Sequence, residues 1–118
     1  MYTVKIPIFV ESIKDSKSFY CEKTNLFEFV FDYGMDTILL SCVSNPTIQL
    51  VLSLENFSAL DSPVFTLNVE DCKKMFDQFK ISIPDYLISK EIFEYPLGKN
   101  FLIKDPSNNL ILISEEMI

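Results

Sequence analysis

The chain contains no histidine, and this absence excludes more chemistry than any residue present suggests. Without histidine there is no Ser-His-Asp or Cys-His catalysis, no histidine acid–base chemistry and no histidine-ligated metal. What remains is carboxylate, thiolate, amine or phenol chemistry, or a protein that binds without catalysing a reaction.

Glycine is scarce and long apolar runs are absent. The chain has 118 residues, of which 48% are hydrophobic, 23% are charged and only 2 are Gly, which predicts one compact, folded domain. No run approaches the roughly 18–20 apolar residues of a membrane span, and the start, MYTVKIPIFVES, alternates like a strand rather than a signal peptide. We therefore expect a cytoplasmic protein with no membrane partner.

Basic residues are few. There are 10 Lys and Arg against 17 Asp and Glu, a formal net charge of −7. Nucleic-acid binding draws its affinity from clustered basic residues, so no nucleic-acid partner is expected. The acidic excess favours a cationic ligand or serves solubility alone.

The chain has an odd number of cysteines, Cys21, Cys42 and Cys72, and they lack a CxxC spacing. This indicates reduced thiols rather than disulfides or a zinc site.

The first half of the chain predicts the order β-α-β-β-β. Apolar residues alternate from Val4 to Val10, as in a strand, and Ser12 is placed to cap a helix from Ile13 to about Lys23. Three further strands are expected at Leu26–Asp32, Thr37–Val43 and Thr47–Leu54, and residues 55–62 form a polar linker.

The second half repeats this order. Asp71 is placed to cap a helix over Cys72–Lys80, and the strands are expected at Val64–Val69, Tyr86–Ile92, Lys99–Lys104 and Leu110–Ser114. The segment Ile8-Phe9-Val10 aligns with Leu67-Asn68-Val69, and Ile48-Gln49-Leu50 aligns with Ile111-Leu112-Ile113. We interpret this as an internal duplication, with one module at about 1–54 and a second at about 63–118. The alternative is that any two strand–helix junctions look alike.

The predicted fold class is α+β, with two paired β-α-β-β-β modules that form a curved sheet around a cleft. In each module the helix covers one face of the strands, and the residues of opposite parity face the cleft. This would place Lys5, Pro7 and Phe9 opposite Val64, Thr66 and Asn68.

Two motifs resemble a known family. They are the first-helix pattern Ser12…Ser16…Phe19-Tyr20 and the turn Asp105-Pro106-Ser107-Asn108-Asn109 before an apolar last strand. Together with the paired modules, they resemble the vicinal oxygen chelate superfamily, which includes glyoxalase I, extradiol dioxygenases, fosfomycin resistance enzymes and bleomycin resistance proteins. Asn108 stands where the family usually has Gly, and Asn tolerates a left-handed backbone.

The resemblance implies where metal ligands would lie. The family's histidine positions fall on Lys5 and Val64, and its carboxylate positions fall on Gln49 and Leu112. This set does not suit a divalent metal, because only Gln49 offers a neutral oxygen. We therefore expect no metal, no cofactor and no catalytic residue.

The first functional hypothesis is a metal-free protein of the bleomycin-resistance-like kind that binds, and so sequesters, a small organic drug or toxin, cationic or aromatic. The resemblance also implies a homodimer. One alternative is a lyase, isomerase or dioxygenase-like enzyme whose displaced metal site uses Asp, Glu, Gln and Cys. Another is a regulatory or partner-binding domain whose own side chains fill the cleft. The expected ligand-binding residues are Lys5, Pro7, Phe9, Gln49, Val51, Val64, Thr66, Asn68, Leu110 and Leu112.

Several candidates have two interpretations. Lys5 is either an amine that binds an anion or forms an imine, or an edge-strand lysine that reaches solvent. Cys72 is a thiolate candidate at a helix start, but packing is favoured because Glu70 and Asp71 oppose its ionisation. Acidic residues, Asp105 included, are expected to be solvated or to cap turns and helices. One strand carries an aromatic row, which is either a wall of the cleft or helix-facing core, with core favoured; its members are Phe27, Phe29, Phe31 and Tyr33. The second half of the chain offers further candidates for the wall of the cleft, namely Tyr86, Tyr95 and Phe101.

Overall fold

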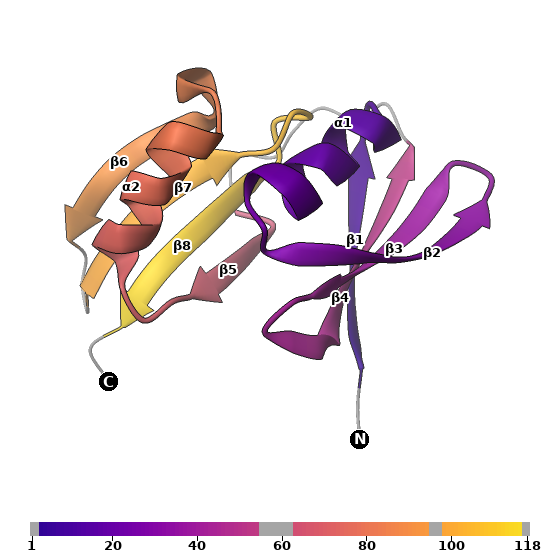
Figure 1. Cartoon of the computed structure of the whole chain (residues 1–118), viewed down its shortest axis with the longest axis horizontal. Coiled ribbons are helices and arrows are strands. Elements are labelled where there is room, and N and C mark those ends of the chain that lie inside the picture. Colours follow the sequence, from indigo (N-terminus) through magenta and orange to yellow (C-terminus); the bar gives the residue numbers. More distant parts are fainter. Residues whose placement is uncertain (1–2, 55–62, 95–97, 117–118) are drawn as a thin grey trace. The chain divides into compact units, whose positions relative to one another are not determined.

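The computed structural model describes residues 3–54, 63–94 and 98–116. The predicted linker, residues 55–62, and Tyr95 lie outside this part. The chain divides into two compact units, residues 1–58 and 59–118, and each contains one helical segment packed on one four-stranded sheet (Figure 1). The α+β prediction with two β-α-β-β-β modules is confirmed; the cleft between them stays a prediction.

In the first unit the strands are ordered β1-β4-β3-β2, and the first and last strands are parallel neighbours. The elements are β1 (Val4–Val10), α1 (Ile13–Lys17), the π-helix η1 (Ser18–Lys23), β2 (Phe27–Gly34), β3 (Thr37–Cys42) and β4 (Asn45–Leu54).

The second unit has the equivalent order β5-β8-β7-β6, again with parallel first and last strands. Its helix α2 lies across one face of this sheet (Figure 1). The elements are β5 (Phe65–Asn68), α2 (Cys72–Ser82), the 3₁₀-helix η2 (Asp85–Leu87), β6 (Ile88–Glu94), β7 (Gly98–Lys104) and β8 (Leu110–Glu116).

The first helix begins as predicted and then changes type. Ser12 caps it, with the Asp15 backbone N–H donating to Ser12 Oγ at 3.1 Å. After Lys17 the α-helix gives way to a π-helix, and the Thr24 N–H reaches back five residues to Phe19 O at 3.0 Å. The wider turn accompanies the burial of two consecutive aromatic side chains, Phe19 and Tyr20, both 0% exposed. The predicted helix from Ile13 to about Lys23 is therefore confirmed in its bounds, and its second half is a π-helix rather than an α-helix.

Side-chain parity in β1 separates two faces of the first sheet. Ile8 and Val10 are buried on the side covered by the helix, together with Leu50 and Leu52 of β4. The alternate residues point to the other side, which we call the open face. The predicted parity of β1 is confirmed, because Lys5, Pro7 and Phe9 are exposed there.

The second unit has an aromatic core beneath α2. Phe101 of β7 is 0% exposed, and its ring centroid lies 5.3 Å from that of Phe76 and 5.9 Å from that of Phe79. The helix N-terminus is capped twice: Asp71 Oδ1 accepts from the Lys74 N–H at 3.0 Å, and Glu115 Oε1 of β8 accepts from the Cys72 N–H at 2.7 Å. The predicted Asp71 cap is confirmed.

Strand register corrects the alignment of the two repeats at their ends. Lys5 pairs with Gln49, whereas Val64, the residue equivalent to Lys5, donates its N–H to Leu110 O at 2.8 Å. Leu112 instead pairs with Thr66. Gln49 therefore corresponds to Leu110, and the alignment with Leu112 was wrong by two residues. A shift of two keeps the side chain on the same face, so both leucines lie on the side of the second sheet away from α2, which is the open face of that sheet.

The turn before β8 is built around a buried carboxylate. Asp105 is 0% exposed, and its Oδ1 accepts from the Ser107 and Asn109 N–H groups at 2.8 and 2.9 Å. Its Oδ2 accepts from Asn109 Nδ2 at 2.9 Å. Asn108 has φ of 67°, the left-handed conformation expected of it. Asp105 serves the turn as predicted, but not in solvent, since three N–H donors replace water.

No helix in the described part of the chain is long and apolar enough to span a membrane.

Candidate functional site

The open face of the first sheet brings several predicted binding residues together. Strand pairing sets Lys5 beside Gln49, Pro7 beside Val51 and Phe9 beside Ser53, all pointing away from the helix. β1 and β4 are hydrogen-bonded neighbours, which are spaced about 4.8 Å apart in sheets. Five of the ten predicted residues therefore share one surface, namely Lys5, Pro7, Phe9, Gln49 and Val51.

The middle of this face is buried and its edges are exposed. Leu39 and Ser41 of β3, at 7% and 4% exposure, form the middle. Phe9 on the β1 edge is 44% exposed, and Phe31 on the β2 edge is 54% exposed. Sequence reasoning missed Leu39 and Ser41 because apolar and polar residues do not alternate along β3. Their neighbours Val51 and Gln49 identify their face.

The aromatic row in β2 is split between the two faces by a bulge. Phe27 pairs with Cys42 and Phe29 with Leu40, which places both on the helix side. The register shifts between Phe29 and Phe31, so Phe31 pairs with Leu39 on the open face. A bulge adds one residue and reverses the parity that follows it. The row is thus neither entirely core nor entirely a wall.

The second half of the row ends in an exposed aromatic pair. The ring centroids of Phe31 and Tyr33 lie 5.0 Å apart in an edge arrangement. Phe27 is fully packed at 2% exposure, whereas Phe29 is 45% exposed beneath Lys17, whose Nζ lies 4.2 Å from its ring centroid. Of the row, Phe31 is therefore the residue that the register assigns to the open face.

The second sheet has a different open face. Thr66 and Asn68 are exposed on β5, paired with Leu112 and Ser114 of β8. Leu110 and Val64, the equivalents of Gln49 and Lys5, are half-buried and apolar. The other five predicted binding residues thus also share one surface. Where the first sheet carries a lysine beside a glutamine, the second carries two apolar residues, and Lys104 of β7 lies next to Leu110.

Two of the predicted second-half wall residues are elsewhere. Phe101 lies beneath α2, because its pairing with Ile113 puts it on the helix side. Tyr86 is 80% exposed in the 3₁₀-helix η2 rather than in a strand, since β6 begins only at Ile88. The open face instead carries Lys90 and Phe93, whose Nζ–ring distance is 4.2 Å. The register shifts in β6 hid this pair from periodicity analysis.

The residues at the family's ligand positions do not fit a metal. Lys5 brings a cation beside Gln49, and in the second unit Val64 and Leu110 offer no donor atom. A divalent cation needs several oxygen, nitrogen or sulfur donors. Elsewhere within residues 3–54, 63–94 and 98–116, no three Cys, Asp or Glu side chains are grouped as a metal site requires.

Cys72 is a packing residue. Its side chain is buried, and its Sγ lies 4.0 Å from Ile113 O. Burial raises the pKa of the Cys72 thiol, and the nearby Glu115 carboxylate raises it further. Burial likewise raises the pKa of the Cys21 thiol. The packing role favoured for Cys72 from the sequence is therefore confirmed.

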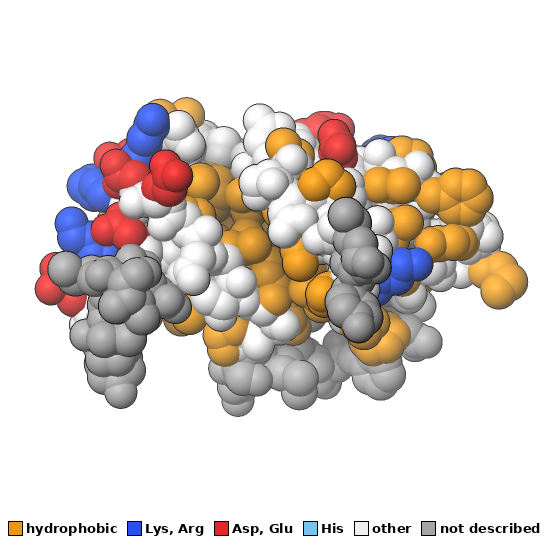
Figure 2. All heavy atoms as spheres, turned by 90° about the horizontal axis from the view of Figure 1, so that it is seen from below, with side chains coloured by type: hydrophobic (Ala, Val, Ile, Leu, Met, Phe, Trp, Pro, Cys, Tyr) orange, Lys and Arg blue, Asp and Glu red, His pale blue; other side chains and the backbone are white. Residues whose placement is uncertain are grey.

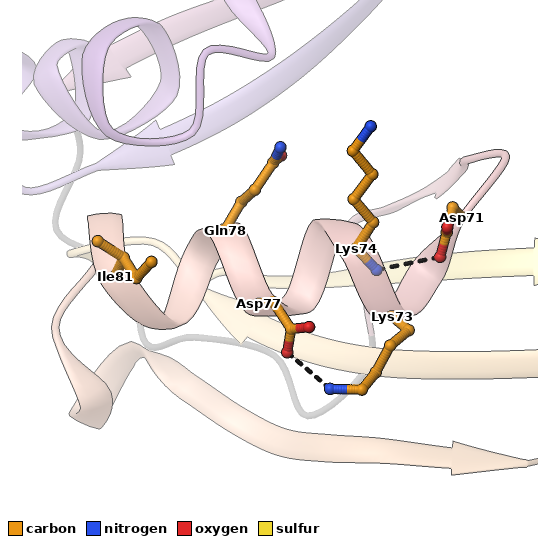
Figure 3. Close-up of a pocket in the computed structure, with 6 residues that line it drawn as sticks. All are labelled: Asp71, Lys73, Lys74, Asp77, Gln78 and Ile81. Carbon is orange, nitrogen blue, oxygen red and sulfur yellow. Dashed lines mark hydrogen bonds and ion pairs between the residues drawn. The ribbon is translucent and has the colours of Figure 1, made fainter.

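A shallow hollow lies along the exposed side of α2, and the side chains that line it are drawn in Figure 3. Lys73 and Asp77 point toward one another there, with Nζ 2.7 Å from Oδ1, whereas Lys74 and Gln78 point away from that pair (Figure 3). These are exposed helix side chains that interact with each other and with water. Their arrangement is that of a solvated helix surface rather than of a ligand site.

Exposed apolar side chains are concentrated in the first unit. Figure 2 shows charged side chains at its left-hand end and hydrophobic ones at its right-hand end, where Figure 1 places the β2–β3 hairpin. Met35 in the hairpin turn is 95% exposed and Tyr33 is 49% exposed. Among the described residues, the exposed large apolar side chains of the second unit are Ile81 and Tyr86.

Sequence comparison finds no matching protein-family model and no matching curated protein. Comparison of structures does find similar folds. UcmS2 is 18% identical with a TM-score of 0.82, and the alignment covers 98% of each chain.

The names of two other similar structures state what the protein binds or the group to which it is assigned. TnmS3, an antibiotic binding protein from Streptomyces sp. CB03234, is 15% identical with a TM-score of 0.76, over 98% of this chain and 96% of that one. A glyoxalase/bleomycin resistance protein/dioxygenase from Alicyclobacillus acidocaldarius is 22% identical with a TM-score of 0.73, over 98% and 92%. The chain therefore has the fold of the glyoxalase/bleomycin resistance/dioxygenase structures.

Proposed function

We propose that this chain is a metal-free member of the bleomycin-resistance-like group that binds a small organic molecule on its open faces. The observation that carries the proposal is the identity of the residues at the positions where the family holds its metal ligands. These positions hold a lysine beside a glutamine in one unit and two apolar residues in the other. The surface around Lys5 combines apolar and aromatic side chains with a few polar groups, which is typical of small-molecule sites.

The structural comparisons supply further support. An antibiotic binding protein shares this fold over nearly its whole length. A fold carries many functions, so the argument depends on the site as well. The proposed binding residues are those predicted from the sequence, with Leu39, Ser41 and Phe31 added to the first face; the predicted ones are Lys5, Pro7, Phe9, Gln49, Val51, Val64, Thr66, Asn68, Leu110 and Leu112.

The test is native mass spectrometry of untagged protein, with metal content measured on the same sample. A co-purifying organic molecule and no stoichiometric metal would support the proposal. A ligand present at 100 times its Kd should stabilise the fold by about 2.7 kcal/mol, so thermal-shift screening extends the search. Stoichiometric zinc, nickel, iron or manganese would overturn metal-free binding in favour of a lyase, isomerase or dioxygenase-like enzyme.

The proposal includes a homodimer that buries the exposed β2–β3 hairpin. Met35 and Tyr33 form an apolar surface of a kind that monomeric proteins seldom leave to solvent. Sedimentation velocity would show a dimer that the double change Met35→Ser and Tyr33→Ser converts to a monomer. Ile81→Ser is the matched control, because Ile81 is 90% exposed on α2. A monomer at all concentrations, or a dimer that only the control disrupts, would contradict this assignment.

A further inference from the structure

A row of polar side chains crosses the open face of the first sheet. Lys5 pairs with Gln49, Gln49 with Ser41, and Ser41 with Glu28. Paired residues point to the same face, so these four side chains form one line across β1, β4, β3 and β2. The next row along the strands is apolar.

That apolar row consists of Pro7, Val51, Leu39 and Phe31. It lies two residues further along each of β1 and β4 than the polar row. The face therefore has a polar row beside a row that suits a ring or hydrocarbon.

Gln49 gives the polar row an unused hydrogen-bond acceptor. Its Oε1 is buried and, among the residues that the structure describes, receives no hydrogen bond. A buried polar atom in this state costs free energy unless something binds it. An O–H or N–H group on a ligand would supply the missing donor when the Gln49 amide turns to expose Oε1.

Lys5 places a positive charge beside that acceptor. It is exposed, and within the described ranges it forms no ion pair. The other charged side chain of the row, Glu28, lies on the opposite edge strand, about 14 Å away at the usual strand spacing. Within this row the charge nearest to Gln49 is thus positive, although the whole chain carries a formal charge of −7.

We infer that the ligand of this face is an anionic aromatic molecule with a hydroxyl or amide donor on its ring. Its carboxylate or other anion binds the Lys5 ammonium, its donor hydrogen-bonds Gln49 Oε1, and its ring lies on Pro7, Val51 and Leu39. This inference rests on the proposed function and specifies its ligand. An anionic ligand replaces the cationic ligand that the net charge suggested, because the neighbouring Lys5 charge acts on a bound ligand more strongly than distant acidic side chains, whose charges are screened by salt.

The second unit provides an internal comparison. Val64 and Leu110 occupy the positions of Lys5 and Gln49, so its open face lacks the lysine–glutamine pair, although Lys104 of β7 continues the same row. That face carries two lysines: Lys104 of β7 pairs with Leu110, and Lys90 lies over the ring of Phe93. Lys90→Met removes the same charge as Lys5→Met and is therefore the matched control.

The experiment compares three probes by amide NMR titration at millimolar concentrations. They are 3-hydroxybenzoate, benzoate without the hydroxyl, and 3-hydroxybenzylammonium with the charge reversed. We expect 3-hydroxybenzoate to bind most tightly, by about tenfold over the ammonium compound, as charge-assisted hydrogen bonds imply. Lys5→Met should remove this preference, whereas Lys90→Met should not.

A second variant tests the acceptor. Gln49→Met should weaken 3-hydroxybenzoate to the level of benzoate and leave benzoate unchanged. The amide spectrum of each variant confirms that it is folded.

The outcomes separate this inference from the proposed function. Preference for the ammonium probe, or binding that Lys5→Met leaves unchanged, would overturn the anionic ligand, but shifts on the open face would still support small-molecule binding. An unchanged affinity in Gln49→Met would overturn the hydrogen bond to Oε1. If no probe shifts any open-face amide, both proposals fail.

Discussion

Replacement of Gln49 by methionine should stabilise the protein in the absence of ligand. The buried Oε1 of Gln49 has no hydrogen-bond partner in the described structure. Methionine has a similar length and no amide, and it suits the apolar neighbours Val51 and Leu39. The change therefore removes a desolvated acceptor without leaving a large cavity.

The magnitude follows from the cost of an unpaired buried polar group, about 1–3 kcal/mol. Gln49 as a whole is only half-buried, so the gain should be near the lower end, about 1 kcal/mol. For a chain of this size, this corresponds to a rise in Tm of roughly 3–5 °C. Binding residues often carry such a cost, because the site is optimised for its ligand rather than for stability.

Urea unfolding of ligand-free protein, followed by circular dichroism, measures this difference. Gln78→Met is the control: Gln78 is exposed on the outer side of α2, and its amide is free to meet water. This control should change the free energy of unfolding by less than about 0.5 kcal/mol. A loss of about 1 kcal/mol or more in Gln49→Met would refute the reasoning, because it would mean that Oε1 has a stabilising partner in the native state.

Three further predictions concern the core, the turn and the thiols. Phe101→Ala should destabilise the protein by about 3–5 kcal/mol in urea unfolding, whereas Phe31→Ala, at an exposed position, should cost much less; similar losses would contradict the assigned faces. Asp105→Ala removes three hydrogen bonds to a buried carboxylate and should cost about 3 kcal/mol, and a near-neutral effect would contradict the turn assignment. Cys72 is buried, and burial raises the pKa of its thiol, so Cys72 should react with a disulfide reagent at pH 8 only in denaturant. The free energy of unfolding should fall above about pH 9, because the thiol ionises in the unfolded state before it ionises in the folded state. Rapid labelling of Cys72 in the native protein would contradict this prediction.

Local patterns predicted most of the fold. The strand Val4–Val10 was predicted with its observed bounds because its alternation is uninterrupted. Ser12 and Asp71 cap their helices as expected, since the side-chain oxygen of each accepts a hydrogen bond from the backbone N–H three residues later. Asn108 takes the left-handed conformation because its short polar side chain allows it.

The errors arose where the backbone departs from regular periodicity. The bulge after Phe29 reverses side-chain parity, so no count of alternating aromatics could assign Phe31 to its face. The π-helix that buries Phe19 and Tyr20 together does not follow the 3.6-residue period. Two register shifts in β6 likewise hid Lys90 and Phe93 from the list of candidate site residues.

The candidate site depended on register more than on residue type. Lys5 and Gln49 are 44 positions apart in the chain, and only the parallel pairing of β1 with β4 makes them neighbours. The sequence identified both residues through the family's ligand positions. It did not identify Leu39 and Ser41, because every position of β3 after Thr37 is buried and the two faces look alike.

Amide chemical-shift mapping with 3-hydroxybenzoate tests the central claim, that the open face of the first sheet binds a small organic molecule. Saturable shifts at Lys5, Gln49 and Val51, on neighbouring strands β1 and β4, are the predicted result. Shifts confined to the outer side of α2, at Lys73 and Asp77, or no saturable shift at any residue, would contradict it.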